Sequence, residues 1–162
     1  MKISEILKQN KRTVSFEVFP PKSDANFESI RMAIEEIAAF SPAYMSVTYG
    51  AGGGRSRYTI DIAENIEEKY GVPTLAHLTC VSSTTDIVAE KIAEMKAAGI
   101  ENVMALRGDI PREGDYPRDY RYAYELIEEL RSAGGFCIGG ACYPEMHPES
   151  KSPEEDIAHL KA

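Results

Sequence analysis

The sequence predicts a single α/β domain in which parallel β-strands alternate with α-helices. Five short apolar runs, each rich in residues that favour strands, alternate with stretches of helical periodicity. Glycine and proline separate these stretches throughout the chain. A chain of 162 residues with 43% hydrophobic content is long enough for one substantial core. Because each strand is followed by a helix, right-handed crossovers should make the sheet parallel.

The elements follow in order from the N-terminus. A short helix is expected at 3–8, and the first strand at 14–19 ends at Pro20-Pro21, which cannot continue a β-ladder. Ser152-Pro153-Glu154-Glu155 is typical of a helix start, with Ser as N-cap, Pro in the first position and Glu in the third. The other strands are expected at 43–49, 74–80, 102–107 and 136–143, and helical stripes run over 27–37, 58–70, 88–95 and 123–130.

The last predicted helix begins at Pro153 and reaches Ala162 without a Gly, Asn or Pro that would end it. We therefore expect the chain to be a truncated part of a larger fold. The residues alone leave two architectures open. One is a complete, doubly wound five-stranded domain. The other is the first five units of an eight-unit barrel, which takes about 250 residues.

Composition excludes several classes of partner. Eighteen basic and 26 acidic residues give a net charge of −8, which argues against nucleic acid and anionic membranes. We find no apolar run long enough to span a bilayer and no signal segment. Cys80, Cys137 and Cys142 match no zinc or redox spacing and lie in apolar, strand-like runs. We expect buried, reduced thiols, no metal and a cytoplasmic location.

Glu17 is the most informative single residue, because it interrupts the first apolar strand. Side chains alternate along a strand, so Glu17 shares a face with Ser15 and Phe19. A carboxylate near the end of a strand and flanked by Phe16 and Phe19 is costly to bury unless it is paired or protonated. This cost suggests a chemical role. The alternative is an edge strand with Glu17 facing water.

Each predicted strand carries a polar residue where it ends. In α/β proteins the functional residues gather at the carboxyl ends of the strands, so one such residue per strand suggests a shared site. Taken singly, His77 could be a core histidine, Thr48 an ordinary strand residue and Tyr143 a core ring. The residues are Glu17, Thr48, His77, Arg107 with Asp109, and Tyr143.

Three further segments could contact a ligand. The glycine-rich loop 50–57 leads into a helix, where anions bind well, but it fits neither the dinucleotide fingerprint nor the P-loop and could be a plain turn. Tyr116, Tyr120, Tyr122 and Tyr124 could stack on a flat ligand or form a surface face. The two prolines that flank His147 would fix its imidazole.

Five segments on successive strands together resemble the methylenetetrahydrofolate reductase family. They are 15–22 (SFEVFPPK), 46–51 (SVTYGA), 76–80 (AHLTC), 105–109 (ALRGD) and 143–148 (YPEMHP). The resemblance runs from about residue 13 to the end of the chain. The family fold is a (β/α)₈ TIM barrel. The resemblance therefore implies that residues 1–162 are a single, truncated, flavin-binding barrel domain with the first five βα units.

The resemblance also implies an activity. In this family FAD takes a hydride from NADH or NADPH and passes it to methylenetetrahydrofolate, and the methyltetrahydrofolate formed feeds methionine synthesis. The folate ring must first open, and the resemblance makes Glu17 the proton donor for that step. Crowding by aromatic rings would then raise the pKa of Glu17. Asp109 matches an aspartate close to the flavin, and we expect a homo-oligomer.

Further positions match flavin contacts of the family, with Arg107 at the pyrophosphate. His159 stands where some members have a flavin-contacting asparagine. Two other functions stay open at this point: a flavin- or nucleotide-binding module without catalysis, and a phosphate-binding α/β enzyme that uses the glycine-rich loop. The matching positions are Thr48, His77, Arg107, Gly108, Asp109, Tyr122, Tyr143, His147 and Asp156.

Overall fold

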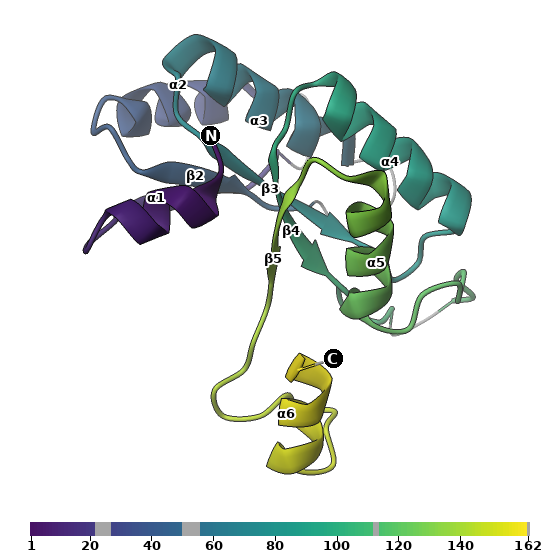
Figure 1. Cartoon of the computed structure of the whole chain (residues 1–162). Helices are drawn as coiled ribbons and strands as arrows, with labels where there is room; N and C mark the ends of the chain where they lie inside the picture. The colour runs from purple at the N-terminus through teal and green to yellow at the C-terminus, as the bar shows by residue number, and fades with distance from the viewer. Residues whose placement is uncertain (22–26, 50–55, 112–113, 162) are drawn as a thin grey trace.

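The computed structural model describes residues 1–21, 27–49, 56–111 and 114–161. In this part of the chain the strands form one parallel sheet in the order β1-β2-β3-β4-β5 (Figure 1). The strands are β1 (Ser15–Val18), β2 (Tyr44–Val47), β3 (Thr74–Thr79), β4 (Asn102–Leu106) and β5 (Cys137–Gly140).

The strand order decides between the two architectures that the residues left open. Every strand pairs with the strand that precedes it in the sequence. In a doubly wound sheet the order of the strands reverses after the first few, so that some neighbouring strands are not consecutive in the sequence. In a (β/α)₈ barrel each strand lies beside the strand that precedes it in the sequence. The structure therefore confirms an α/β fold built as five consecutive units of the barrel type.

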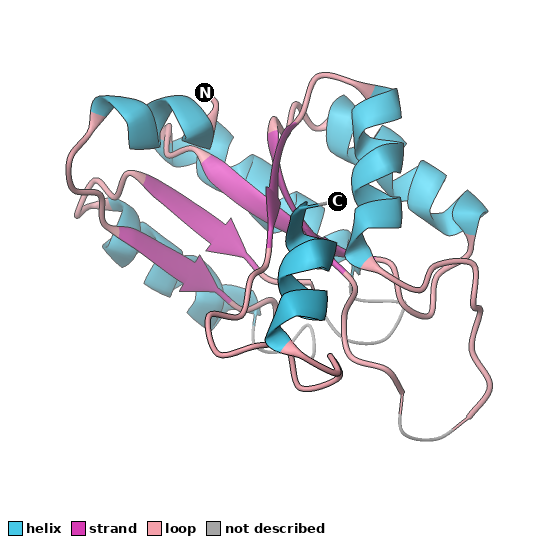
Figure 2. Cartoon of the chain, turned by 60° about the horizontal axis from the view of Figure 1, so that its bottom comes forward, coloured by secondary structure: helices cyan, strands magenta, loops and turns pink. Residues whose placement is uncertain are grey.

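The helices lie on both sides of this sheet. Helices α2 to α5 cover one face, α1 lies on the other, and α6 stands apart below the sheet in the view of Figure 1. Figure 2, turned to show the carboxyl ends of the strands, places α6 in front of them. No helix in the described residues is long and apolar enough to cross a membrane. The helices are α1 (Ile3–Gln9), α2 (Phe27–Ala38), α3 (Ser56–Tyr70), α4 (Thr85–Ala97), α5 (Ala123–Ala133) and α6 (Pro153–Lys161).

The main core lies between the sheet and α2 to α5. Alternate residues of β2, β3 and β4, such as Val47, Leu78 and Val103, point to this side and are buried. They pack against the apolar stripes of the helices, including Ile66 and Leu126. On the opposite face a smaller cluster joins Ile3, Ile6 and Leu75 with Ala43, Tyr44 and Met104. Helix α1 thus covers the other face of the sheet near the amino ends of the strands.

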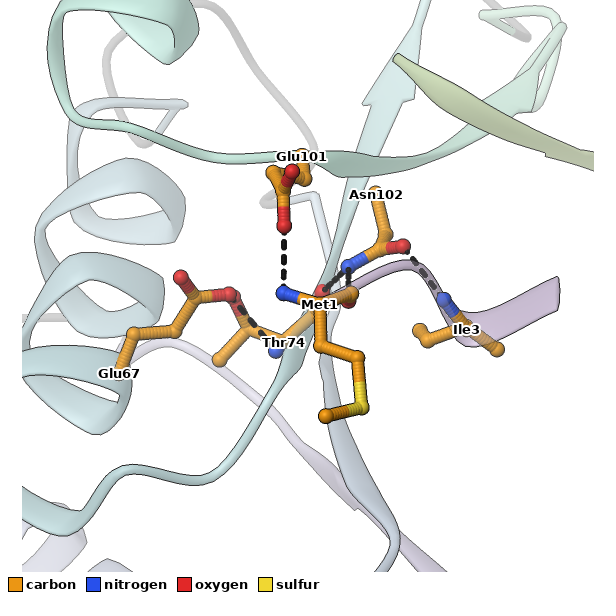
Figure 3. Close-up of polar contacts among 6 residues, drawn as sticks. All are labelled: Met1, Ile3, Glu67, Thr74, Glu101 and Asn102. Carbon is orange, nitrogen blue, oxygen red and sulfur yellow. Dashed lines mark hydrogen bonds and ion pairs between the residues drawn. The ribbon is translucent and has the colours of Figure 1, made fainter. Parts of the chain in front are cut away.

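A buried amide fastens the N-terminus to this amino end. The side chain of Asn102 accepts a hydrogen bond from the backbone N–H of Ile3 (2.8 Å) and donates to the carbonyl oxygens of Met1 (3.1 Å) and Thr74 (3.0 Å) (Figure 3). The carboxylate of Glu67 accepts from the backbone N–H of Thr74 (2.9 Å) and from its hydroxyl (2.6 Å). The Met1 ammonium pairs with Glu101. Asn102 and Thr74 are fully buried.

The predicted strands are correct in number and order but too long at some ends. The expected strand 136–143 ends at Gly140, because β4 offers its last partner at Ala105, which is opposite Gly140. Tyr143 therefore lies in the loop after β5. The expectation of three buried cysteines is also wrong. Cys80 is buried, Cys137 is half-buried and Cys142 is exposed in that same loop.

Candidate active site at the carboxyl ends of the strands

Three polar side chains from three adjacent strands meet on the face of the sheet that carries α1. Glu17 of β1 stands opposite Ser46 of β2, and His77 lies on the same face of β3. The Ser46 hydroxyl donates a hydrogen bond to Glu17 Oε2 (3.0 Å), and His77 Nε2 lies 3.7 Å from the same oxygen. These residues line a hollow of about 410 Å³ together with Ser15, Phe16, Tyr44, Leu75 and Met104.

Glu17 is open to solvent in this arrangement. Its side chain is 45% exposed, because β1 is an edge of the sheet among the described residues. Phe16 and Phe19 are 36% and 66% exposed, so their rings do not enclose the carboxylate. The two rings alone therefore do not crowd Glu17, and the expected crowding by Phe16, Phe19 and the flavin together stays a prediction. The specific partners of Glu17 are polar groups of the neighbouring strands.

His77 occupies the more enclosed side of the same hollow. Its side chain is only 14% exposed, as expected for the central strand β3. Burial lowers the pKa of His77 from its ordinary value, while the nearby charge of Glu17 acts in the opposite direction. The imidazole is therefore neutral at pH 7, with one nitrogen as donor and the other as acceptor.

A second group of polar contacts joins the end of β4 to the segment before α6. The Arg107 guanidinium contacts Glu149 through two hydrogen bonds, from Nη1 to Oε2 (2.5 Å) and from Nη2 to Oε1 (2.9 Å). Arg107 Nε also donates to the carbonyl oxygen of Gly108 (3.1 Å). The Glu149 carboxylate raises the pKa of Arg107 further, and the guanidinium lowers the pKa of Glu149.

The same segment brings three predicted residues together. Asp156 at the start of α6 accepts hydrogen bonds from the backbone N–H of His147 (3.1 Å) and from the Ser150 hydroxyl (2.9 Å). The ring of His147 meets the ring of Tyr143 edge-on, with centroids 4.8 Å apart. Tyr143, His147 and Asp156 therefore form one connected group, which the backbone N–H of Glu149 extends by donating to His147 Nδ1 (3.1 Å).

Gly108 has a steric reason to be glycine. Its φ is +86°, and a Cβ there would lie 2.9 Å from Val81 Cγ1 and 3.1 Å from Thr79 Cβ. The chain thus turns closely over the end of β3. The next residue, Asp109, is exposed, and its charge also contributes to the raised pKa of Arg107 after that of Glu149.

Thr48 and Tyr122 are placed by different neighbours. The backbone of Thr48 is held by hydrogen bonds, from its N–H to the Val18 carbonyl (3.0 Å) and from the Thr59 hydroxyl to its own carbonyl (3.0 Å). Tyr122 is the N-cap residue of α5 and stacks on Tyr124 with centroids 5.8 Å apart. Its other ring neighbour is His159 of α6, at 5.9 Å.

Six of the predicted site residues therefore form two groups, and Thr48 and Tyr122 belong to neither. Glu17 and His77 make one group with Ser46, and Arg107, Tyr143, His147 and Asp156 make the other with Glu149. Sequence reasoning missed Ser46 and Glu149. The position of Ser46, two residues before Thr48 in an apolar strand, was a usable signal for the first; Glu149 offered none. The glycine-rich loop, predicted at 50–57, lies for residues 50–55 outside the described part of the chain.

Comparison with known proteins gives one consistent result. A family model described as methylenetetrahydrofolate reductase matches residues 2–162. The 5,10-methylenetetrahydrofolate reductase of Pectobacterium carotovorum subsp. carotovorum is 38% identical over 153 residues, which are 94% of this chain and 51% of that protein. The protein of the same name from Buchnera aphidicola subsp. Acyrthosiphon pisum is 40% identical over 94% of this chain and 52% of its own length.

A plant protein is also similar. Methylenetetrahydrofolate reductase (NADH) 1 of Arabidopsis thaliana is 31% identical over 99% of this chain and 30% of its own length. The chain spans about half the length of the bacterial relatives it matches.

Proposed function

Because the chain belongs to the methylenetetrahydrofolate reductase family, we propose that it carries the proton-donating part and most of the flavin-binding part of an enzyme that reduces methylenetetrahydrofolate to methyltetrahydrofolate. The observation that most supports this proposal is the group of Glu17, Ser46 and His77 at one hollow of the sheet. It unites a carboxyl group, a hydroxyl and a neutral imidazole beside solvent. These are groups that can hold and move one proton.

The residues at the carboxyl ends fit a flavin nucleotide. Arg107 supplies N–H donors for a diphosphate, and the exposed rings of Tyr122 and Tyr143 supply flat surfaces. When bound, FAD would supply hydride transfer in two separate steps, from a reduced nicotinamide and then to the folate. The residues that we propose to hold it are Thr48, His77, Arg107, Gly108, Asp109, Tyr122, Tyr143, His147 and Asp156.

Glu17 has a defined task in this proposal. The bridging ring of the folate opens only when its leaving nitrogen is protonated, and Glu17 would hold that proton at its carboxyl group. The Ser46 hydroxyl orients Oε2, to which it donates a hydrogen bond of 3.0 Å. His77 is neutral and lies 3.7 Å from the same oxygen, so a proton would pass between the two groups through a bridging water. Asp109 would act more generally, by placing a negative charge near the reacting groups.

The test is the substitution Glu17→Gln in the natural protein that contains residues 1–162. Glutamine keeps the size of Glu17 but cannot donate this proton, so the oxidation of reduced flavin by methylenetetrahydrofolate should slow by roughly 10²–10⁴-fold. Reduction of the flavin by NADH or NADPH should stay close to the wild-type rate. Stopped-flow absorbance of the flavin, with each substrate supplied separately, resolves the two steps.

Two controls make this result specific. Glu36→Gln removes an exposed carboxylate of α2 and should change neither step. Asp109→Asn should slow both steps mildly, because its charge acts on the whole site. Equal slowing of both steps by Glu17→Gln would make Glu17 a structural or flavin-tuning residue. If the protein binds flavin but reduced nicotinamide does not bleach the flavin absorbance, the protein is a binding module without this activity.

Self-association also stays a prediction. The outer sides of β1 and β5 are the edges of the sheet within the described residues, and such edges can pair with another chain. Sedimentation velocity over a range of concentrations tests it, since a monomer at every concentration would contradict the expectation.

A further inference from the structure

Arg107 is already engaged within the protein. In the described part of the chain, three of its five N–H groups donate hydrogen bonds, two to Glu149 and one to Gly108. The side chain is only 19% exposed, and the Glu149 carboxylate takes both terminal nitrogens in a bidentate pair. Its positive charge is therefore largely compensated, and its plane is fixed.

Glu149 is at the same time connected to the segment before α6. Its backbone N–H donates to Nδ1 of His147, so in the neutral imidazole the proton sits on Nε2. The backbone N–H of His147 in turn donates to Asp156. Glu149 thus connects the end of β4 with the imidazole of His147, and the backbone N–H of His147 continues these contacts to the first turn of α6.

Polar contacts supply much of the attachment of this segment, beside the ring contact of His159 with Tyr122. Helix α6 has no buried residue, and Tyr143, Glu145 and Glu149 are exposed. With so little apolar area removed from water, hydrogen bonds and the ion pair must supply much of the order between β5 and α6.

We propose that Glu149 is a positioning residue. Its carboxylate locks the Arg107 guanidinium, and this ion pair anchors residue 149, whose backbone N–H holds His147 and with it Tyr143 and Asp156 in one arrangement at the end of β4. Arg107 then offers a ligand its two remaining N–H donors in a fixed orientation. Because Glu149 compensates its charge, it does not act as a free cation. The part of this inference that concerns the flavin rests on the proposed function, but the ordering of the segment does not.

Hydrogen–deuterium exchange of the ligand-free chain tests the ordering directly. In Glu149→Ala, exchange of the amides of His147 and Ser150 should accelerate about threefold to tenfold, because the ion pair and its hydrogen bonds are lost. Glu149→Gln keeps the shape of the side chain and should give a smaller acceleration. The double variant with Arg107→Glu and Glu149→Arg should restore part of the protection, which a loss of general stability would not do.

The controls separate this effect from unfolding. Glu145→Gln changes an exposed charge of the same loop and should leave exchange unchanged, and the amides of β3 should stay protected in every variant. Unchanged exchange of the 143–156 segment in Glu149→Ala would overturn the proposal. So would equal acceleration in β3, because Glu149 would then contribute to the whole fold.

Titration with FAD, followed by quenching of its fluorescence, tests the consequence for a ligand. If Glu149 positions the site, Glu149→Ala should weaken FAD binding about threefold to tenfold. If Glu149 instead competes with the diphosphate for Arg107, the same variant should bind FAD more tightly, and the proposal fails. A wild-type chain that binds no FAD would contradict the proposed function, while the exchange experiment would still decide the role of Glu149.

Discussion

The two ends of the sheet use polar side chains in different ways. At the amino ends, Asn102 and Thr74 are fully buried, and their side chains are hydrogen-bonded to fixed neighbours. At the carboxyl ends, Glu17 is 45% exposed and Glu149 is 54% exposed. A buried amide whose partners are all within the protein contributes to the stability of the fold and cannot reach a ligand. A half-exposed carboxyl group can still accept hydrogen bonds from a ligand. The separation matches the rule that stability lies at one end of a barrel sheet and function at the other.

Asn102→Ala should give the largest loss of stability among the variants considered. A small loss would contradict the view that the amino ends of the strands stabilise the fold. The substitution leaves the Ile3 N–H and the Thr74 carbonyl without their partner inside the protein, so the free energy of unfolding should fall by about 3 kcal/mol. Urea denaturation measures it. Asn10→Ala is the matched control, since Asn10 is exposed and bonds only the end of α1. An equal loss in both variants would show that the buried network adds little.

Gly108→Ala sharpens the comparison at the other end. A Cβ at Gly108 would meet Val81 Cγ1 at 2.9 Å with φ at +86°, so we expect a loss of about 2 kcal/mol in the free energy of unfolding. Gly114 has nearly the same φ, +89°, but among the described residues nothing lies within 4 Å of a Cβ there. Gly114→Ala should therefore cost about 1 kcal/mol, the price of the backbone conformation alone. Similar thermal shifts in the two variants would contradict the close approach.

The pH dependence of stability tests whether burying His77 at the carboxyl end of β3 destabilises the fold. Burial lowers the pKa of His77 in the folded chain, so the unfolded chain binds more protons just below the ordinary value of 6.5. Stability should therefore fall as the pH drops through the window between 6.5 and the lowered pKa, and His77→Gln should reduce this dependence.

A Glu17 variant is the control for the assignment of the pKa shift to His77. Glu17 raises the pKa of His77 against the effect of burial, and Ser46 is the other polar group at the pair. Glu17→Gln should therefore lower the pKa of His77 further. An NMR titration of the imidazole measures both values, and a pKa above 6.5 in the wild-type chain would show that the charge of Glu17 exceeds the effect of burial.

The Met1 ammonium should give the smallest effect. Its hydrogen bond with Glu101 raises its pKa above 8.0, so its stabilisation is complete below that pH and is lost as the pH rises through the folded value. Both partners are largely exposed, at 65% and 45%, and the contribution should be at most about 0.5 kcal/mol. Denaturation of the wild type and of Glu101→Gln at neutral and alkaline pH measures it. A pH dependence that persists in Glu101→Gln would exclude this pair as the cause.

Local patterns were sufficient to predict the strands, the helices and the polar carboxyl ends. The apolar runs and their punctuation by glycine and proline depend only on neighbouring residues, and so do the residues that follow each strand. The partners of those residues do not. Asn102 binds Met1 and Ile3 across about a hundred residues, and Glu149 meets Arg107 across 42 residues from a position that no local pattern singled out. The exposure of Glu17 depends on whether another strand lies beside β1, which is a property of the whole sheet.

The order of the strands also has a consequence in time. Because every strand pairs with the one made just before it, each new unit can add to a sheet that already exists while the ribosome is still working. The N-terminus is the exception. The carbonyl of Met1 and the N–H of Ile3 find their partner only when Asn102 emerges, 99 to 101 residues later. Residues 1–3 thus gain their polar partner only when β4 has been made, whereas the apolar side of α1 can already pack on Tyr44 and Leu75 of the earlier strands.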